Sequence, residues 1–334
     1  MSSAAQPDQQ ADSLRGVQPD PEESAAIRRK IEALTPRLSL PTVRRALGAM
    51  EGEHHSRRPN GSDDPMETRP YTPEDEARLI DWKMSARSGR PMVTERERLV
   101  TSRIHLFIDT GREMTGVCPS GERALDVAAN GLCMFASLSA KRHDQITLTF
   151  ADSVSITRVP FKGGLAQFER TIDDGLTHTS NVSRNFDALL DYIPTIGDRG
   201  SLVVIATDEH ALREEHLKKI RKIAMGHPLI MVVVSTLNPF RDYPFGEVTD
   251  GDSGRQVPAF MRGGETAEEV DRHRSYMAAQ LEQELRRNNA TMIRSASSQG
   301  MFDEFIHLLS TTLKRAPLTP LAGSVSVGLT GVAA

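Results

Sequence analysis

The chain has 334 residues, of which 38% are hydrophobic, and a formal net charge of −4. This length allows one large domain or two ordinary ones, and the small net charge gives no reason to expect binding to nucleic acid or to an anionic membrane. The two cysteines lack metal-ligand spacing and the N-terminus shows no signal pattern, so we expect a cytoplasmic protein. No apolar run approaches the roughly 20 residues that cross a bilayer, so we expect no membrane span.

Composition divides the chain into four segments. Residues 1–23 are polar and rich in Gln, Asp, Ser and Pro, and residues 316–334 show no helical periodicity, so both are predicted to be disordered tails. Residues 24–100 form a charged N-terminal segment, and residues 101–315 form the main domain.

Strand and helix patterns alternate along the main domain. This alternation predicts an α/β fold with a doubly wound, mostly parallel sheet flanked by helices, an N-terminal extension packed on it and a C-terminal hairpin–helix addition. The expected strands are 103–109, 145–151, 153–160, 201–208, 229–235 and 290–296, the expected hairpin is 245–260, and the expected helices are 121–142, 165–172, 181–193, 211–224, 266–288 and 301–313.

Two aspartates follow apolar strands of the predicted sheet. Asp109 ends "RIHLFID" and Asp208 ends "SLVVIATD". Ligands of doubly wound sheets bind beyond the carboxyl ends of the central strands, so both acids are expected at the ligand edge. Loop hydroxyls from "THTSN" (177–181) can join them there, and such a set of oxygens suits Mg²⁺. Nearby, Asp187, Glu209 and His210 have no partner that the sequence identifies.

The order of these features resembles a von Willebrand factor A domain: Asp-x-x-x-x-Met after the first strand, a Thr/Ser loop before a middle helix, and an Asp after the next apolar strand. The stretch "RPYTPEDEARLIDWKMSARSGRPMV" (69–93) further resembles the signature of the family called Domain of Unknown Function 58. The residues that carry this resemblance are Arg69, Tyr71, Pro73, Asp75, Arg78, Ile80, Asp81, Trp82, Ser85, Ala86, Arg87 and Gly89.

The von Willebrand A resemblance implies a metal-ion-dependent adhesion site with an Asp-x-Ser-x-Ser core. This chain has Gly111 and Glu113 in place of the two serines. The favoured interpretation is a degenerate site in which Asp109 and Asp208 accept hydrogen bonds from loop amides, without a cofactor, and the alternative is that Mg²⁺ binds. The candidate ligands are Asp109, Glu113, Thr179 (or Ser180 beside it) and Asp208.

The charged segment around Trp82 permits two interpretations. The favoured one is an internal clamp, in which arginine–carboxylate pairs surround a buried Trp82 and the segment packs on the main domain. Truncation of a buried tryptophan costs about 3–5 kcal/mol. The alternative is a surface on which a partner docks, and self-association through this segment and the 266–288 helix is a third possibility.

The family resemblance implies a function. Members of this bacterial family are commonly encoded beside MoxR-type AAA+ ATPases and are thought to act with them as adaptors in the assembly or maturation of other proteins. We therefore expect a non-enzymatic protein-interaction module with a MoxR-type AAA+ partner. The alternative is a metal-dependent hydrolase that uses Asp109, Glu113 and Asp208.

Overall fold

The computed structural model describes residues 21–38, 46–47, 63–72, 80–98, 102–177, 182–242, 255–258, 260, 264–288 and 290–315. Several predictions concern residues outside these ranges and are not addressed by the structure: the two tails beyond Pro21 and Arg315, most of the 245–260 hairpin, the motif residues Pro73, Asp75 and Arg78, and the loop hydroxyls of Thr179 and Ser180.

Six strands form the central sheet, in the order β5-β4-β3-β6-β7-β8. All pair in parallel except β5, which runs antiparallel to β4. Counted along the chain this order is 3-2-1-4-5-6, the doubly wound order, so the predicted fold class is confirmed. The strands are β3 (Arg103–Asp109), β4 (Gln145–Ala151), β5 (Ile156–Phe161), β6 (Leu202–Asp208), β7 (Leu229–Val234) and β8 (Thr291–Ser295).

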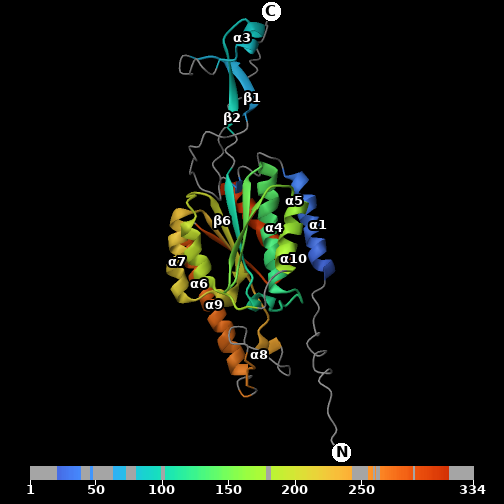
Figure 1. The fold of residues 1–334 in the computed structure, drawn as a ribbon, viewed down its shortest axis with the longest axis vertical. Helices are drawn as coiled ribbons and strands as arrows, with labels where there is room; N and C mark the ends of the chain where they lie inside the picture. Colours follow the sequence, from blue (N-terminus) through green and yellow to red (C-terminus); the bar gives the residue numbers. More distant parts are fainter. Residues whose placement is uncertain are drawn as a thin grey trace, which may run out of the picture.

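Helices cover both faces of this sheet (Figure 1). On one face lie α1 (Pro21–Arg37), α4 (Ala124–Arg142), α5 (Leu165–Thr177) and α10 (Ser298–Arg315). On the other lie α6 (Phe186–Tyr192), α7 (Glu214–Gly226) and α9 (Gly264–Arg287). The connections also contain the short elements η3 (Arg112–Thr115), η4 (Ile193–Thr195), η5 (Glu209–Ala211) and α8 (Pro239–Asp242).

The two-sided cover explains the sequences of the central strands. Every residue of β6 and β7 is buried, as the unbroken apolar runs predict for parallel strands covered on both faces. Alternate residues therefore enter different cores: Val204 packs with α4, whereas Val203 packs with α6 and α7.

The N-terminal segment is divided between two places. Helix α1 packs against α4 and α10, and the Arg28 guanidinium binds both carboxylate oxygens of Asp173 at 2.5 and 2.6 Å. The predicted packing of the N-terminal extension is therefore right for α1.

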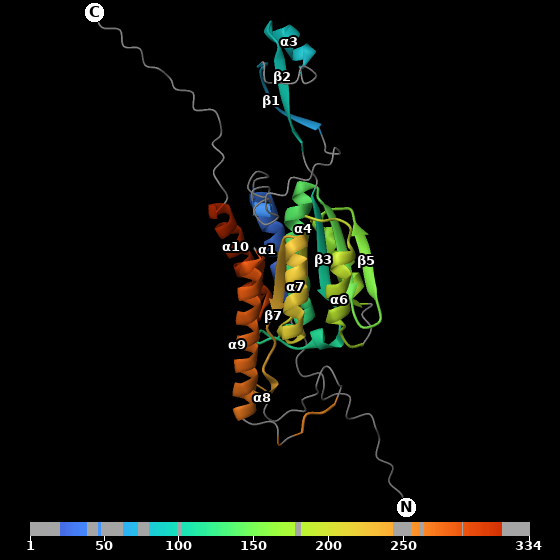
Figure 2. The same cartoon turned by 90° about the vertical axis from the view of Figure 1, so that its left-hand side faces the viewer.

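Residues 63–98 are arranged differently. Strands β1 (Asp63–Pro70) and β2 (Met92–Arg98) pair antiparallel, with α3 (Trp82–Ser88) between them in the chain. Both views show this projecting unit, β1–α3–β2, standing away from the six-stranded sheet and its helices (Figures 1 and 2).

Candidate functional site

The carboxyl ends of β3 and β6 meet at the point where the strand order reverses. Their last residues, Asp109 and Asp208, are 2% and 1% exposed. Each carboxylate caps the loop that follows: Asp109 accepts a hydrogen bond from the Gly111 amide at 3.0 Å, and Asp208 accepts bonds from the His210 and Ala211 amides at 2.9 and 3.0 Å. These bonds agree with the favoured interpretation of the two acids.

Arg184, which the sequence analysis did not single out, places its guanidinium between the strand-end acids. It donates to both oxygens of Asp208, with Nη1–Oδ1 at 2.8 Å and Nη2–Oδ2 at 2.7 Å. Its Nη1 lies 3.4 Å from Oδ2 of Asp109, and its Nε lies 3.7 Å from Oε2 of Glu113. The structure thus brings three of the four predicted ligands together around one internal cation, and the fourth, Thr179, lies outside the described residues.

Backbone contacts hold Arg184 in this position. The Arg184 amide donates to Oε2 of Glu113 at 2.9 Å, and the Arg112 amide donates to the Val182 carbonyl at 2.8 Å. Gly111 permits this approach, because a Cβ added there would lie 2.6 Å from the N and Cα atoms of Arg184. The two departures from the adhesion motif therefore serve the same arginine: Gly111 makes room for the backbone of Arg184, and Glu113 binds it.

The ionisation of the two aspartates differs. Burial raises the pKa of Asp109 to about 6, against the lowering effect of Arg184. Asp208 is equally buried, but its bidentate pair with Arg184 outweighs the burial and lowers the pKa of its carboxyl below the ordinary value. Although burial opposes it, Asp208 also raises the pKa of Arg184, so the guanidinium stays charged.

These residues do not fit a divalent cation. Mg²⁺ requires about six oxygen ligands near 2.1 Å in an octahedron, and the guanidinium of Arg184 takes the space and the carboxylate charge that such an ion needs. Gly111 offers no side-chain ligand. The signal in the sequence was the loss of both motif serines. Arg184 itself gave none, because it falls inside the predicted helix 181–193, whereas the observed α6 begins only at Phe186.

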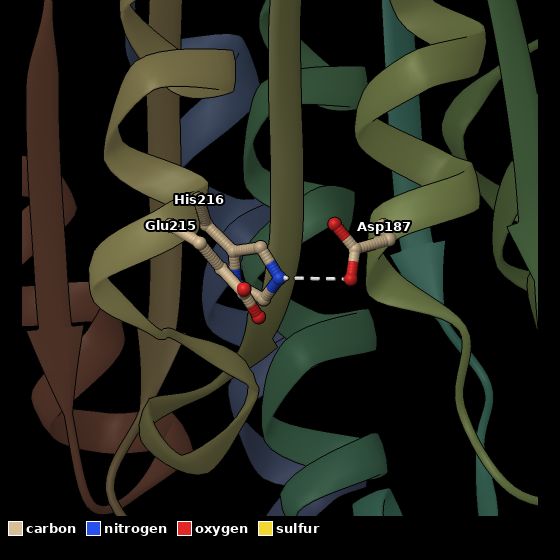
Figure 3. A group of neighbouring side chains, drawn as sticks. All are labelled: Asp187, Glu215 and His216. Atoms are coloured by element: carbon tan, nitrogen blue, oxygen red, sulfur yellow. Dashed lines mark ion pairs between the residues drawn. The ribbon is translucent and has the colours of Figure 1, made fainter.

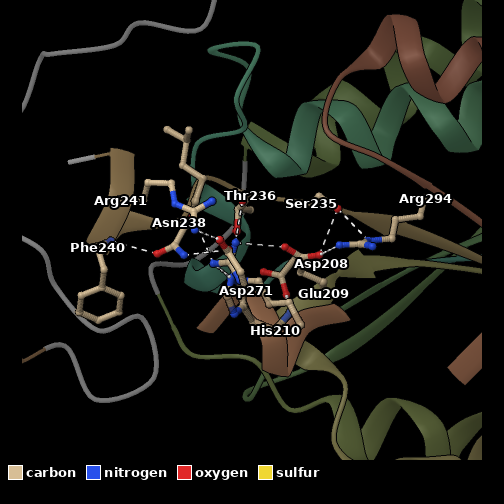
Figure 4. Close-up of polar contacts among 12 residues, drawn as sticks. Asp208, Glu209, His210, Ser235, Thr236, Asn238, Phe240, Arg241, Asp271 and Arg294 are labelled. Atoms are coloured by element: carbon tan, nitrogen blue, oxygen red, sulfur yellow. Dashed lines mark hydrogen bonds and ion pairs between the residues drawn. The ribbon is translucent and has the colours of Figure 1, made fainter. Parts of the chain in front are cut away.

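A second buried network lies beside β6 (Figure 4). Oε2 of Glu209 accepts from Arg294 at 2.6 Å and from Ser235 at 3.1 Å, and Oε1 lies 3.2 Å from Arg274. Arg274 also donates to the Thr236 carbonyl at 2.9 Å. This network ties β6, β7, β8 and α9 together, so Glu209 is a structural anchor rather than a free acid.

Asp187, Glu215 and His216 lie close enough to suggest a metal site (Figure 3). Nδ1 of His216 accepts a hydrogen bond from the Arg213 amide at 3.1 Å, so the neutral ring carries its proton on Nε2, which lies 3.4 Å from Asp187. Lys219 binds the other oxygen of Asp187 at 2.7 Å. Nδ1 of His216 is already used in capping α7, and Asp187 is already paired with Lys219, so hydrogen bonding and charge pairing account for these two residues without a metal ion.

Trp82 lies at the start of α3 with 72% of its surface exposed. The predicted internal clamp is therefore wrong, and so is the cost of 3–5 kcal/mol that a buried tryptophan implied. The projecting unit buries Met92 and Val93 of β2, at 8% and 2% exposure, whereas Trp82 at the first position of α3 lies outside this small interior.

Three other motif residues build this short helix. Asp81 is the N-cap and accepts from the amides of Lys83 and Met84, both at 3.0 Å. Ser85 ties the helix to β2 by accepting from the Met92 amide at 2.8 Å, and Gly89 ends it in the left-handed conformation with φ of 69°. Because capping accounts for these residues and not for Trp82, the exposed indole needs another explanation.

The fold and this site define a doubly wound α/β protein whose strand-end carboxylates are held by an internal arginine. The model of the family described as "Protein of unknown function DUF58" matches residues 67–241, just over half of the chain. The chain therefore belongs to the DUF58 family, as the motif around Trp82 predicted.

Similar proteins include "Uncharacterized protein Rv1480" of Mycobacterium tuberculosis (strain H37Rv) and "Uncharacterized protein Mb1516" of Mycobacterium bovis, each 27% identical over 71% of this chain and 72% of the relative. Two solved structures are also similar, each with 10% sequence identity. One is an aerotolerance-related membrane protein from Bacteroides fragilis, with a TM-score of 0.40 and a match that covers 64% of this chain and 99% of that chain. The other is the SpRpn10 VWA domain, with a TM-score of 0.32 and a match that covers 62% of this chain and 95% of that chain. None of the described helices of this chain has the length and apolar composition that crossing a bilayer requires.

Proposed function

We propose that this protein is a non-enzymatic adaptor that binds other proteins through two separate surfaces. One is the projecting unit with Trp82. The other is the rim, defined as residues 110–116, 182–185 and 209–213 around the ends of β3 and β6. An adaptor needs at least two such surfaces, and the projecting unit stands apart from the sheet that carries the rim (Figure 2).

The observation that carries this proposal is the exposure of Trp82. Tryptophan and arginine are the residues most enriched among those that dominate binding energy in protein interfaces. Trp82 is 72% exposed, and the exposed Arg87 lies on the same short helix. Asp81, Ser85 and Gly89 fix the helix that displays the indole, so the motif builds a support and leaves its largest side chain for a partner.

The chemistry of the rim supports binding rather than hydrolysis. A metal-dependent hydrolase needs carboxylates free to hold an ion, or a base free to accept a proton. Asp109, Glu113 and Asp208 instead surround the Arg184 guanidinium. We accordingly propose that the rim binds its partner without a metal ion.

The proposed partner of the projecting unit is a MoxR-type AAA+ ATPase, and this assignment rests on the family. The test is the affinity of the full chain for a purified MoxR-type ATPase of the same cell, measured by biolayer interferometry. Trp82→Ala removes an interface tryptophan worth at least about 2 kcal/mol, so the affinity should fall about 30-fold or more. Met225→Ala is the matched control, because Met225 is a large apolar residue with 78% exposure on α7, outside both surfaces.

The role of the rim can be tested with a matched pair of variants, one on the rim and one away from it. Thr115 and Thr195 are both exposed, both end a short 3-10 helix, and both donate their hydroxyl to the carbonyl three residues earlier, at 2.6 Å. Thr115 lies on the rim, whereas Thr195 follows α6 at the opposite end of the sheet. If the rim binds a client captured from the native cell, Thr115→Arg should abolish capture and Thr195→Arg should not.

The outcomes separate the parts of the proposal. Equal affinity of wild type and Trp82→Ala for the ATPase would overturn the role of the projecting unit. Absence of any ATPase binding by the wild type would overturn the choice of partner. Equal client capture by both threonine variants would overturn the role of the rim.

A further inference from the structure

A groove runs along the outer edge of the sheet, where β8 is the last strand. It encloses about 570 Å³ and lies between α9 on one face of the sheet and α10 on the other. Met292, Arg294 and Ser295 of β8 form its floor, and neither surface of the proposed adaptor function includes it.

Among the described residues no strand pairs with the outer side of this floor, so its backbone hydrogen-bonding groups face the groove. The Ser295 carbonyl accepts from the Ser235 amide at 2.9 Å, so the backbone of Ser295 faces β7. Because the N–H and C=O groups of successive strand residues point to opposite sides, the backbone groups of Met292 and Arg294 face the groove. Such an edge is a template for one more strand.

The walls leave room for a single extended chain. Ser275, Ala278 and Ala279 lie on one stripe of α9, and their small side chains allow a backbone to approach the edge. Since α9 and α10 both flank the edge, a second copy of this sheet with its own flanking helices would collide with them. A lone strand would lie about 4.8 Å from β8, in the space of about 570 Å³ that α9, β8 and α10 line.

The handedness of the fold argues against the chain's own C-terminal residues in this place. From β6 to β7 and from β7 to β8 the chain moves outward, and the connecting helices α7 and α9 lie on one face. Helix α10 lies on the other face, so a strand that followed it beyond β8 in parallel would complete a crossover of the opposite hand. Such crossovers occur in only about 2% of cases.

The charges of the groove define the peptide that it suits. Glu282 lies on the α9 wall and Glu304 on the α10 wall. Arg294 is already paired with the buried Glu209, so it does not offset these acids. Arg286, one turn further along α9, binds Glu282 in an exposed i,i+4 pair. Because exposed pairs of this kind are weak, a cation of the peptide can take the place of Arg286 or share the carboxylate with it. Successive side chains of an extended peptide point to opposite faces, and one therefore faces each wall. We propose that this groove binds an extended segment of a partner protein as a seventh strand, with a Lys or Arg directed toward each of the two glutamates.

The test is selection of a phage-displayed library of random decapeptides on the full chain. Ala279→Trp should fill the groove, whereas Ala166→Trp introduces the same residue at an exposed alanine on α5. We expect peptides with alternating β-branched residues and at least two basic residues. Their affinity should fall at least tenfold for Ala279→Trp and stay within twofold for Ala166→Trp.

Two further measurements distinguish strand addition from other binding. Bound peptide should slow amide hydrogen exchange at Met292 and Arg294, and Glu282→Lys with Glu304→Lys should change the selected peptides from basic to acidic. Failure to select any peptide, equal affinity for both tryptophan variants, or unchanged exchange at β8 would overturn the proposal. So would displacement of the selected peptide by a synthetic peptide of residues 320–331, because the groove would then belong to the chain's own C-terminal segment.

Discussion

Replacing Arg184 with alanine removes the guanidinium that contacts all three acids of the rim. Arg184 is 10% exposed, and the side chains of Asp109, Glu113 and Asp208 are 2%, 7% and 1% exposed. Loss of one partner from a buried ion pair leaves an uncompensated charge and costs about 3–5 kcal/mol. We expect a loss of this size in the free energy of unfolding at pH 7, measured by urea denaturation with linear extrapolation.

Two further variants test the reasoning behind this value. Arg184→Lys keeps the charge but cannot form the bidentate pair with Asp208, so its loss should be intermediate. Arg103→Ala removes an arginine that is 44% exposed and 3.2 Å from Asp198, and such an exposed pair is worth below about 1 kcal/mol. If Arg184→Ala cost no more than Arg103→Ala, the guanidinium would not be compensating the three acids.

The same variant should acquire sensitivity to metal. Without the guanidinium, three carboxylates face a common space that a divalent cation can enter. An ion that binds only the folded state at 100 times its Kd adds about 2.7 kcal/mol to stability. Millimolar Mg²⁺ should therefore raise the melting temperature of Arg184→Ala, and an unchanged melting temperature would show that the carboxylates cannot rearrange around an ion.

Three more predictions concern single residues. Burial raises the pKa of Asp109 from 3.8 to about 6, so its protonated form contributes stability that is complete below pH 3.8 and is lost as the pH rises through 6. Asp109→Asn should remove this pH dependence of the free energy of unfolding, measured by urea denaturation between about pH 4 and 6. If the free energy of unfolding of the variant still changed with pH as in the wild type, the assignment would be wrong. Gly111→Ser restores a motif serine but overlaps the backbone of Arg184, so it should cost about 1–3 kcal/mol, whereas Gly164→Ser, with no atom within 4 Å of its added Cβ, should have little effect. Trp82→Ala should change the free energy of unfolding by no more than about 0.5 kcal/mol, because the side chain is exposed; a loss of several kcal/mol would restore the buried clamp.

The strands at the centre of the fold could be predicted because their sequences carry the pattern of their environment. Residues 202–208 are apolar throughout, and a parallel strand is buried on both faces, so the sequence indicates both the strand and its place in the sheet. The positions of Asp109 and Asp208 at one edge then follow from the parallel direction of β3 and β6.

The role of Arg184 could not be predicted in the same way. It lies 75 residues from Asp109 in the chain numbering and 24 from Asp208, and its contacts depend on how the segment before α6 folds back over η3. The sequence held a partial signal, since Gly111 and Glu113 stand where an adhesion site has serines. That signal predicts a degenerate site, but it does not identify the residue that occupies it.

Trp82 was misjudged for a physical reason. A single tryptophan is usually part of a core, and the surrounding arginines and acids suggested a buried network. The decisive information was local: Asp81 and Gly89 bound a helix of only seven residues, which joins the strands of a hairpin. Met92 and Val93 of β2 fill the small interior of this unit, and Trp82 at the first position of the helix remains exposed.

We propose that this protein carries its own cation at the strand ends and binds its partners without a metal. The most direct measurement is a calorimetric titration of the wild-type chain with Mg²⁺ at pH 7. With Arg184 in the place of the ion, no binding heat beyond dilution should appear up to millimolar concentrations. A saturable heat with one ion per chain and a micromolar Kd would contradict the claim.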